Sequence, residues 1–473
     1  MTSAPGTHYA YQAVYAYLAT LIAEATGERK VRLSSLRALA TRLGVSVSTV
    51  QHAYQLLESE GRIISVPKSG YYAAVSPTLH PARTLAAQAN ADSDLLPRLY
   101  NDAHTPGMLA LHRSDPWPGN ALGRALIARE RQVQRQHANP ASHPLGEPEL
   151  RRELAARYTR STHHRWCSDD VYLGADLRAI FDTTLAALDL RGHAVLITSP
   201  ASPVLLMALK AARLAICELP LDAQGAPDLD LAAHFMRTRP VALVVLGSAL
   251  NGPQGTSMPE DTRQALARLL DHHGTLLLED DDHSPLCFRQ ATPLRDLIDP
   301  QRLLVCGSFA RAFGAEARYG YLLARPLAGN PVAAAVRQRL LQRDYHLPPV
   351  RQKAIARLYQ SGGIDAQLRP LRARLKLNIA RLVQQLNDGL GDLLEVPMPA
   401  GGSGVWVSSR RPIDARTVYA QLLKRHILVA PGEVFSAQGE HHQSLRIACP
   451  VEGQGLPGRV LVELRRALVA GRC

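Results

Sequence analysis

Four short, largely apolar runs in the middle of the chain restrict its fold more than any other feature. They cover residues 194–197, 241–246, 275–278 and 303–306, and helical patterns alternate with them. A strand that is apolar on both faces must be buried on both faces, as in a parallel sheet covered by helices. The sequence therefore predicts an α/β fold with a mainly parallel central sheet. A smaller C-terminal lobe, beginning near Pro349, is predicted to follow it.

The first 76 residues show a different pattern, in which three segments with the apolar spacing of amphipathic helices precede two β-prone segments. Ser34 or Ser35 is placed to cap the second helix and Ser46 the third, because a serine hydroxyl can accept hydrogen bonds from the first free amides of a helix. Gly44 supplies the tight turn between these helices. The β-prone segments are residues 63–66 and 71–75, on either side of a Pro-Lys-Ser-Gly turn. The pattern predicts an α+β winged helix-turn-helix.

Such a module binds double-stranded DNA. Its third helix enters the major groove with its N-terminal residues against base edges, while the wing and the second helix contact phosphates. Short hydroxyls can bond bases or phosphates, and a valine methyl can pack on a thymine methyl. The residues expected to contact DNA are Arg37, Ser46, Val47, Ser48, Thr49, His52, Lys68 and Ser69. The alternative role is a helical hairpin used only for dimer packing.

Charge and composition limit the remaining possibilities. The formal net charge of +13 favours an acidic partner. No uninterrupted apolar stretch reaches the roughly 18 residues of a membrane-spanning helix, and the N-terminus lacks the basic start and apolar run of a signal peptide. The six cysteines form no CxxC pair, so neither a disulfide framework nor a zinc site is indicated. We expect a cytoplasmic protein without a membrane or metal partner.

Domain boundaries follow from these patterns. Residues 1–76 form the predicted winged helix, and residues 77–105, rich in Pro, Ala, Asp and His, the predicted linker. The α/β part then covers residues 106–473.

Three N-terminal segments resemble the winged helix-turn-helix of the GntR family of regulators. They are Leu33-Ser34-Ser35-Leu36-Arg37-Ala38-Leu39-Ala40, Leu43-Gly44-Val45-Ser46-Val47-Ser48-Thr49-Val50 and Lys68-Ser69-Gly70-Tyr71-Tyr72. The resemblance implies a DNA operator as partner and places Arg37 on the phosphate-contacting arginine of the family. Val47 stands where the family usually has arginine.

The rest of the chain resembles fold-type I, class I/II aminotransferases, which use pyridoxal phosphate (PLP). The matching elements are Leu145-Gly146-Glu147-Pro148-Glu149-Leu150-Arg151, Asn251-Gly252-Pro253-Gln254-Gly255, Glu279-Asp280-Asp281-Asp282-His283, the segment from Cys306 to Tyr321, and Leu445-Arg446-Ile447. With its N-terminal module, the whole chain resembles a MocR-type regulator, in which a winged helix is fused to an aminotransferase-like dimer. A homodimer is implied.

The resemblance also assigns a pocket. It gives Asp280 to the pyridine nitrogen, Ser308 and Arg318 to the cofactor phosphate, and Arg446 to a substrate carboxylate. Arg311 stands at the position of the PLP-binding lysine, and a guanidinium keeps its proton and has no free lone pair for an aldehyde. His283 is assigned to the tyrosine position, and Gly252 replaces an asparagine beside Asn251. We therefore expect no covalent PLP but a cationic cleft, with Asp280, Asp281 and Asp282 opposite, that binds a small anionic or zwitterionic effector.

The favoured function is a DNA-binding transcription regulator that uses a degenerate aminotransferase-like domain for dimerisation and metabolite sensing. Two variants of it stay open, namely a cleft that binds nothing and a cleft that binds PLP without a covalent bond. The alternative from another class is a PLP-dependent aminotransferase with an accessory DNA-binding module. It would need another lysine, and the candidates are Lys210, Lys353, Lys376 and Lys424.

Overall fold

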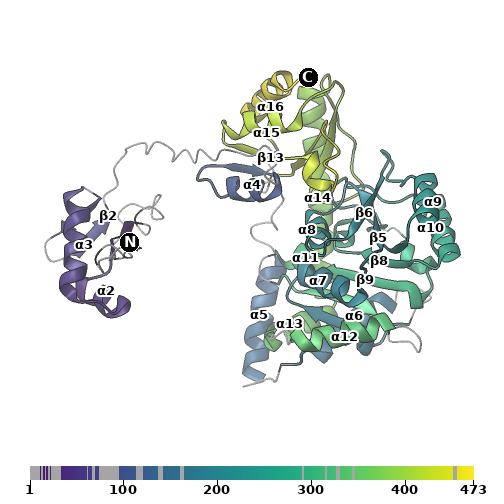
Figure 1. The fold of residues 1–473 in the computed structure, drawn as a ribbon, viewed down its shortest axis with the longest axis horizontal. Helices are drawn as coiled ribbons and strands as arrows, with labels where there is room; N and C mark the ends of the chain where they lie inside the picture. Colours follow the sequence, from purple (N-terminus) through teal and green to yellow (C-terminus); the bar gives the residue numbers. More distant parts are fainter. Residues whose placement is uncertain are drawn as a thin grey trace, which may run out of the picture. The chain divides into compact units, whose positions relative to one another are not determined.

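The computed structural model divides into two compact units, Met1–Ser93 and Asp94–Cys473 (Figure 1). It describes residues 11, 14–15, 17–19, 22, 33–60, 62–66, 70–73, 95–112, 121–136, 142–159, 165–289, 292–314, 317–325, 331–343, 347–450 and 455–472. None of the helices in these ranges combines the length and the apolar composition that crossing a membrane requires.

The first unit has the predicted winged helix-turn-helix. Its elements are α2 (Leu36–Leu43), α3 (Val47–Ser59), β1 (Ile63–Val66) and β2 (Gly70–Ala73). Ser35 caps α2 and Ser46 caps α3, each accepting a hydrogen bond from a backbone amide in the first turn. Gly44 adopts the left-handed conformation, with φ of 65°, that ends α2. The strands pair antiparallel, and the inward residues of α3 pack with Val14, Leu18 and Leu39 in a small core.

The second unit is built on a seven-stranded, mainly parallel sheet, which confirms the predicted fold class. Its strands are β4 (Val171–Gly174), β5 (Ala194–Ser199), β6 (Ala215–Pro220), β7 (Val241–Leu246), β8 (Leu276–Asp280), β9 (Leu303–Ser308) and β10 (Gly320–Ala324), in the spatial order β4-β10-β9-β8-β7-β5-β6. Only β10 runs antiparallel to its neighbours. The four apolar runs of the sequence became β5, β7, β8 and β9, each buried from both sides.

Helices cover the two faces of this sheet. One face carries α5 (Ala121–Gln136), α6 (Pro148–Thr159), α9 (Leu229–Thr238), α10 (Glu260–His273) and α13 (Pro349–Gln360), and the other carries α7 (Leu177–Leu188), α8 (Pro203–Ala211) and α12 (Pro331–Arg343). A short helix, α11 (Ala310–Phe313), follows β9. Because strand side chains alternate between faces, β5 sends Leu196 into one core and Val195 and Ile197 into the other.

The smaller lobe combines the C-terminal part of the chain with two elements that precede the large sheet. Its five-stranded sheet has the order β11-β12-β14-β13-β3. The elements are α4 (Leu95–Asp102), β3 (Leu109–Leu111), α14 (Gly363–Leu390), β11 (Leu394–Glu395), β12 (Gly404–Ser409), α15 (Ala415–Leu423), β13 (Ile427–Pro431), β14 (Ser444–Ala448) and α16 (Gly458–Ala470). Figure 1 shows α15 and α16 side by side at the C-terminal end.

The lobe does not begin near Pro349 as predicted. Helix α13 and the first turns of α14 pack in the core of the large sheet, whereas α14 contributes Ile379, Leu382 and Leu386 to the core of the smaller lobe. One continuous helix therefore links the two lobes. Helix α4 lies inside the predicted linker, and its Leu96 and Leu99 pack against the smaller lobe.

Candidate functional site

The N-terminal end of α3 presents the residues predicted to meet DNA. Ser46, Val47, Ser48 and His52 are exposed and Thr49 is half-buried. The hydroxyl of Ser46 accepts a hydrogen bond from the amide of Thr49 at 3.1 Å and lies 2.8 Å from the Ser48 hydroxyl and 2.7 Å from the Thr49 hydroxyl. The three hydroxyls thus form one cluster that starts the helix.

The other predicted DNA contacts lie around this helix. Val47 is 43% exposed at the first position of α3, and the ring of His52 meets the ring of Tyr11 edge-on, with centroids 4.8 Å apart. Arg37 is exposed in the first turn of α2. Lys68 and Ser69 lie outside the described residues. The described part of this surface carries hydroxyl, methyl and cationic groups, which are the groups that contact bases and phosphates.

A second candidate site lies at the carboxyl ends of β5, β7 and β8, where ligands bind in open α/β sheets. The acidic side chains from Glu279 to Asp282, at the end of β8, point alternately to two sides of the sheet. Arg295 donates to Glu279 at 2.9 Å and to Asp281 at 3.0 Å in a buried network. Asp280 and Asp282 face the other way, toward the pocket and Arg311. Placing Asp281 in the cleft was therefore wrong.

Asp282 is the residue that meets Arg311. The Nε of Arg311 donates to Oδ2 of Asp282 at 2.8 Å, and the Ser308 hydroxyl donates to the other carboxylate oxygen. Burial alone would raise the pKa of Asp282, but the charge of Arg311 holds it below its usual value. Asp282 is therefore charged at neutral pH and forms an ion pair with the guanidinium of Arg311 within the protein. Asp282 was among the three acidic residues predicted to lie opposite the cationic side chains of the cleft, and it meets Arg311 there.

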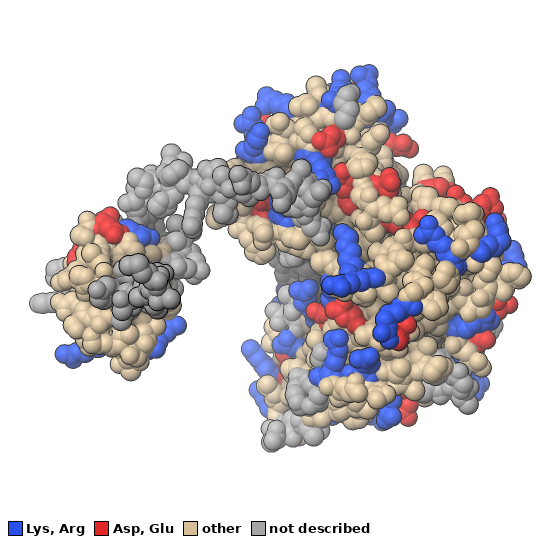
Figure 2. Space-filling model, viewed as in Figure 1, with Lys and Arg blue, Asp and Glu red and all other residues tan. Residues whose placement is uncertain are grey.

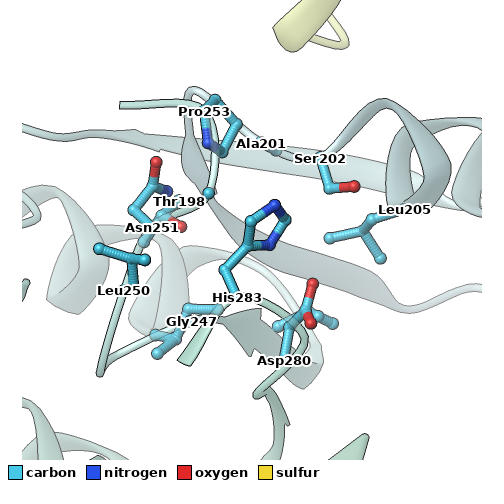
Figure 3. A pocket seen from close by; sticks show the side chains of 13 residues that line it. Thr198, Ala201, Ser202, Leu205, Gly247, Leu250, Asn251, Pro253, Asp280 and His283 are labelled. Carbon is cyan, nitrogen blue, oxygen red and sulfur yellow. The ribbon is translucent and has the colours of Figure 1, made fainter. Parts of the chain in front are cut away.

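His283 fills the pocket beside Asp280. In Figure 3 its imidazole projects between the loop at 251–253 and the start of α8. A Cβ atom at Gly252 would lie 2.4 Å from the ring, so only glycine leaves room for it. Burial lowers the pKa of His283 to about 3, assisted by Arg311, and the imidazole is neutral at neutral pH. The free volume is about 30 Å³, enough for one or two water molecules.

Asp280 lines the same pocket. Its carboxylate accepts a hydrogen bond from the amide of Asp282 at 3.0 Å. Burial and the negative charge of Asp282 raise the pKa of Asp280 to about 7. The neutral form of this carboxyl group is therefore favoured more than in an ordinary aspartic acid.

Arg446 is a buried cation with no carboxylate partner in the described part of the chain. It lies in β14 between Trp406 of β12 and Ala430 of β13 and is 9% exposed. Its Nη1 donates to the carbonyl oxygen of His112 at 3.4 Å. Burial and the charge of Arg311 lower the pKa of Arg446 to about 10, so it stays protonated at neutral pH. A buried charge without a counter-ion is costly, and an anion here would relieve that cost.

Two other predicted pocket residues differ in their exposure. Asn251 lines the pocket, but its amide donates to the carbonyl of Pro200 at 3.0 Å and accepts from the amide of Gln254 at 3.0 Å. Its polar atoms are thus used to hold the loop. Arg318 is exposed just before β10 and is not among the residues that line this pocket.

The N-terminal end of α7 shows whether a cofactor phosphate could bind there. A helix N-terminus attracts anions, and here the carboxylate of Asp176 takes that place by accepting a hydrogen bond from the amide of Ala179 at 2.8 Å. A phosphate would meet this negative charge. The imidazole in the pocket and the Arg311–Asp282 pair add to the misfit, so the residues present do not fit covalently bound PLP.

A winged helix-turn-helix followed by a large parallel α/β sheet and a smaller lobe defines a fusion of a DNA-binding module with an aminotransferase-type scaffold. The chain belongs to the family of class I and II aminotransferases, whose model matches residues 120–454, and residues 10–72 match the model of bacterial regulatory proteins of the gntR family. Members of this aminotransferase fold use PLP as cofactor.

Two relatives match this chain over most of their own length. The chain is 25% identical to the uncharacterized HTH-type transcriptional regulator YjiR of Escherichia coli K12, over 92% of this chain and 94% of that protein. It is 28% identical to the uncharacterized HTH-type transcriptional regulator YdcR of the same organism, over 90% of this chain and 92% of that protein. An archaeal alanine:glyoxylate aminotransferase structure matches 80% of this chain and 95% of its own length, with a TM-score of 0.70 and 19% identity, and shares the fold.

Proposed function

We propose that the protein is a MocR-type transcription regulator whose winged helix binds an operator and whose aminotransferase-type unit binds an effector and forms a homodimer. One observation carries the proposal: a winged helix with its own core is fused to an aminotransferase scaffold in which Arg311 is ion-paired with Asp282. The resemblance places Arg311 where PLP-dependent relatives have their lysine. The relatives YjiR and YdcR, named as transcriptional regulators, support it. The proposed DNA partner supports a cytoplasmic location.

The same contacts argue against an aminotransferase. Arg311 offers no nucleophilic amine, and the second unit has only the four lysines named above. None of them lines the pocket. Lys353, for example, is held by Glu147 at 2.8 Å and Glu149 at 3.3 Å. The proposed regulator is therefore not an enzyme and holds no covalent PLP.

The proposed effector is a small carboxylate. Its site is formed around Arg446, whose charge has no carboxylate to balance it among the described residues. The carboxyl group of Asp280 lines the pocket at the end of β8 and can accept a hydrogen bond from an ammonium group, so a zwitterion is included in the class. An effector of this kind acts only by binding two arrangements of the dimer unequally.

The first prediction concerns DNA affinity. Arg37→Ala should weaken binding of the full chain to all duplex sequences alike, because a phosphate contact carries no base information. The slope of log K against log salt should fall by roughly one. A fluorescence anisotropy titration at several salt concentrations measures both quantities. Arg465→Ala, which removes an exposed arginine paired with Asp392 in the other unit, is the control. Unchanged affinity and slope in Arg37→Ala would refute the proposed docking.

The second prediction concerns assembly. The full chain should sediment as a dimer at micromolar concentration without DNA, because the resemblance to fold-type I enzymes implies sites built across a two-fold interface. A two-fold dimer would then bind an operator with two half-sites. Sedimentation velocity measures the assembly state. A monomer at this concentration would remove the geometric basis for paired half-sites.

A further inference from the structure

The recognition helix α3 contains neither lysine nor arginine. Guanine is most often read in the major groove by one of these two side chains, which donate to its O6 and N7 acceptors. The base edges that α3 meets must therefore be recognised by other groups. The exposed side chains of its first two turns decide which groups these are.

Most candidates on this face already have partners. The hydroxyls of Ser46, Ser48 and Thr49 bond to one another and cap the helix. The ring of His52 packs edge-on against Tyr11. These contacts fix the orientation of the four side chains and use part of their hydrogen-bonding capacity.

Val47 and Gln51 differ from these side chains because neither is held by a side-chain contact of this kind in the described residues. Both are exposed, and within the described residues the Gln51 amide has no hydrogen-bond partner. They are separated by four positions, so their side chains lie next to each other on one face of the helix. That face belongs to the N-terminal half of α3, which is the half that contacts base edges in a helix-turn-helix.

We propose that Gln51 reads an adenine and that Val47 packs on the methyl group of a thymine in each operator half-site. The glutamine amide has one donor and one acceptor group, which match N7 and N6 of adenine in a bidentate contact. The thymine methyl is the one apolar group on the major-groove edge of the bases, and it suits an exposed valine. Neighbouring A·T pairs are thus the chemistry recognised. This inference rests on the proposed function, because it requires that α3 enters DNA.

The test is selection of bound sequences from a randomised duplex library by the full chain, followed by anisotropy titrations on the selected site. The wild type should select an adenine whose replacement by guanine weakens binding roughly 5- to 150-fold. Gln51→Ala should lose this discrimination, and Gln51→Arg should change the preferred base to guanine. Gln55→Ala is the matched control, since Gln55 is another exposed glutamine one turn further from the N-terminus, and it should retain the adenine.

The outcomes separate the two proposals. Salt-dependent DNA binding by the wild type without a selected adenine, or an unchanged preference in Gln51→Ala, overturns the assignment of Gln51 while the regulator remains supported. No DNA binding by the wild type contradicts the proposed function itself. Gln51 is exposed, so thermal unfolding followed by circular dichroism should show the same midpoint in all four proteins.

Discussion

Arg446→Gln should make the ligand-free protein more stable and remove its response to carboxylates. In the wild type, a buried guanidinium has one long hydrogen bond to a carbonyl and no counter-ion among the described residues. A neutral amide of smaller size can donate to the same carbonyl without the cost of a buried charge. We expect a gain of about 1–3 kcal/mol in the free energy of unfolding, the usual range for a polar group that is buried without full compensation.

The response to ligand should change in the opposite direction. A carboxylate that binds the folded wild type at about 100 times its dissociation constant should add about 2.7 kcal/mol to its stability. Urea unfolding with glutamate or succinate, against matched sodium chloride, measures this addition. Arg446→Gln should show none of it, whereas Arg465→Gln on the surface should respond like the wild type. An equal response in Arg446→Gln and the wild type, or no response to either carboxylate in the wild type, would contradict the proposed effector site.

The fold could be predicted because its determinants are local. The caps at Ser35 and Ser46 and the turn at Gly44 depend on a few consecutive residues, and the structure confirms each of them. The four apolar runs similarly indicate strands buried on both sides without any information about their partners. The order of the strands and the place of the smaller lobe are different, because they depend on contacts between distant segments. The boundary between lobes fell inside α14 because one helix can bury its two halves in two cores.

The site was less predictable because it, too, depends on contacts between residues that are distant in the sequence. The pair between Arg311 and Asp282 joins the ends of two neighbouring strands, and the ring of His283 needs the missing side chain at Gly252. In the sequence, Arg311, His283 and Gly252 each look like a separate departure from the aminotransferase motif. In the structure these residues contact one another, so the changes are mutually consistent. The alternation of side chains from Glu279 in β8 through the two residues that follow this strand was a local signal that could have separated Asp281 from Asp282.

Loss of PLP chemistry should be visible as the absence of a covalent product. Arg311 offers no amine, the imidazole of His283 lies in the pocket, and the carboxylate of Asp176 lies at the N-terminus of α7. From these contacts we expect the wild-type protein to lack the nucleophile, the space and the charge that the cofactor requires. Arg311→Lys restores an amine, but Asp282 beside it would keep that amine protonated and His283 would still fill the pocket. We expect this variant to bind more PLP than the wild type, though well below one equivalent.

The most direct measurement is mass spectrometry of the protein after incubation with one equivalent of PLP and reduction with borohydride. The scaffold as described predicts no pyridoxyl group on Lys210, Lys353, Lys376 or Lys424 of the wild type, and a partial one on the new lysine of Arg311→Lys. A stoichiometric pyridoxyl group on any of these four wild-type lysines would contradict the claim that this aminotransferase-type unit has left PLP chemistry, and would favour an aminotransferase with an accessory DNA-binding module.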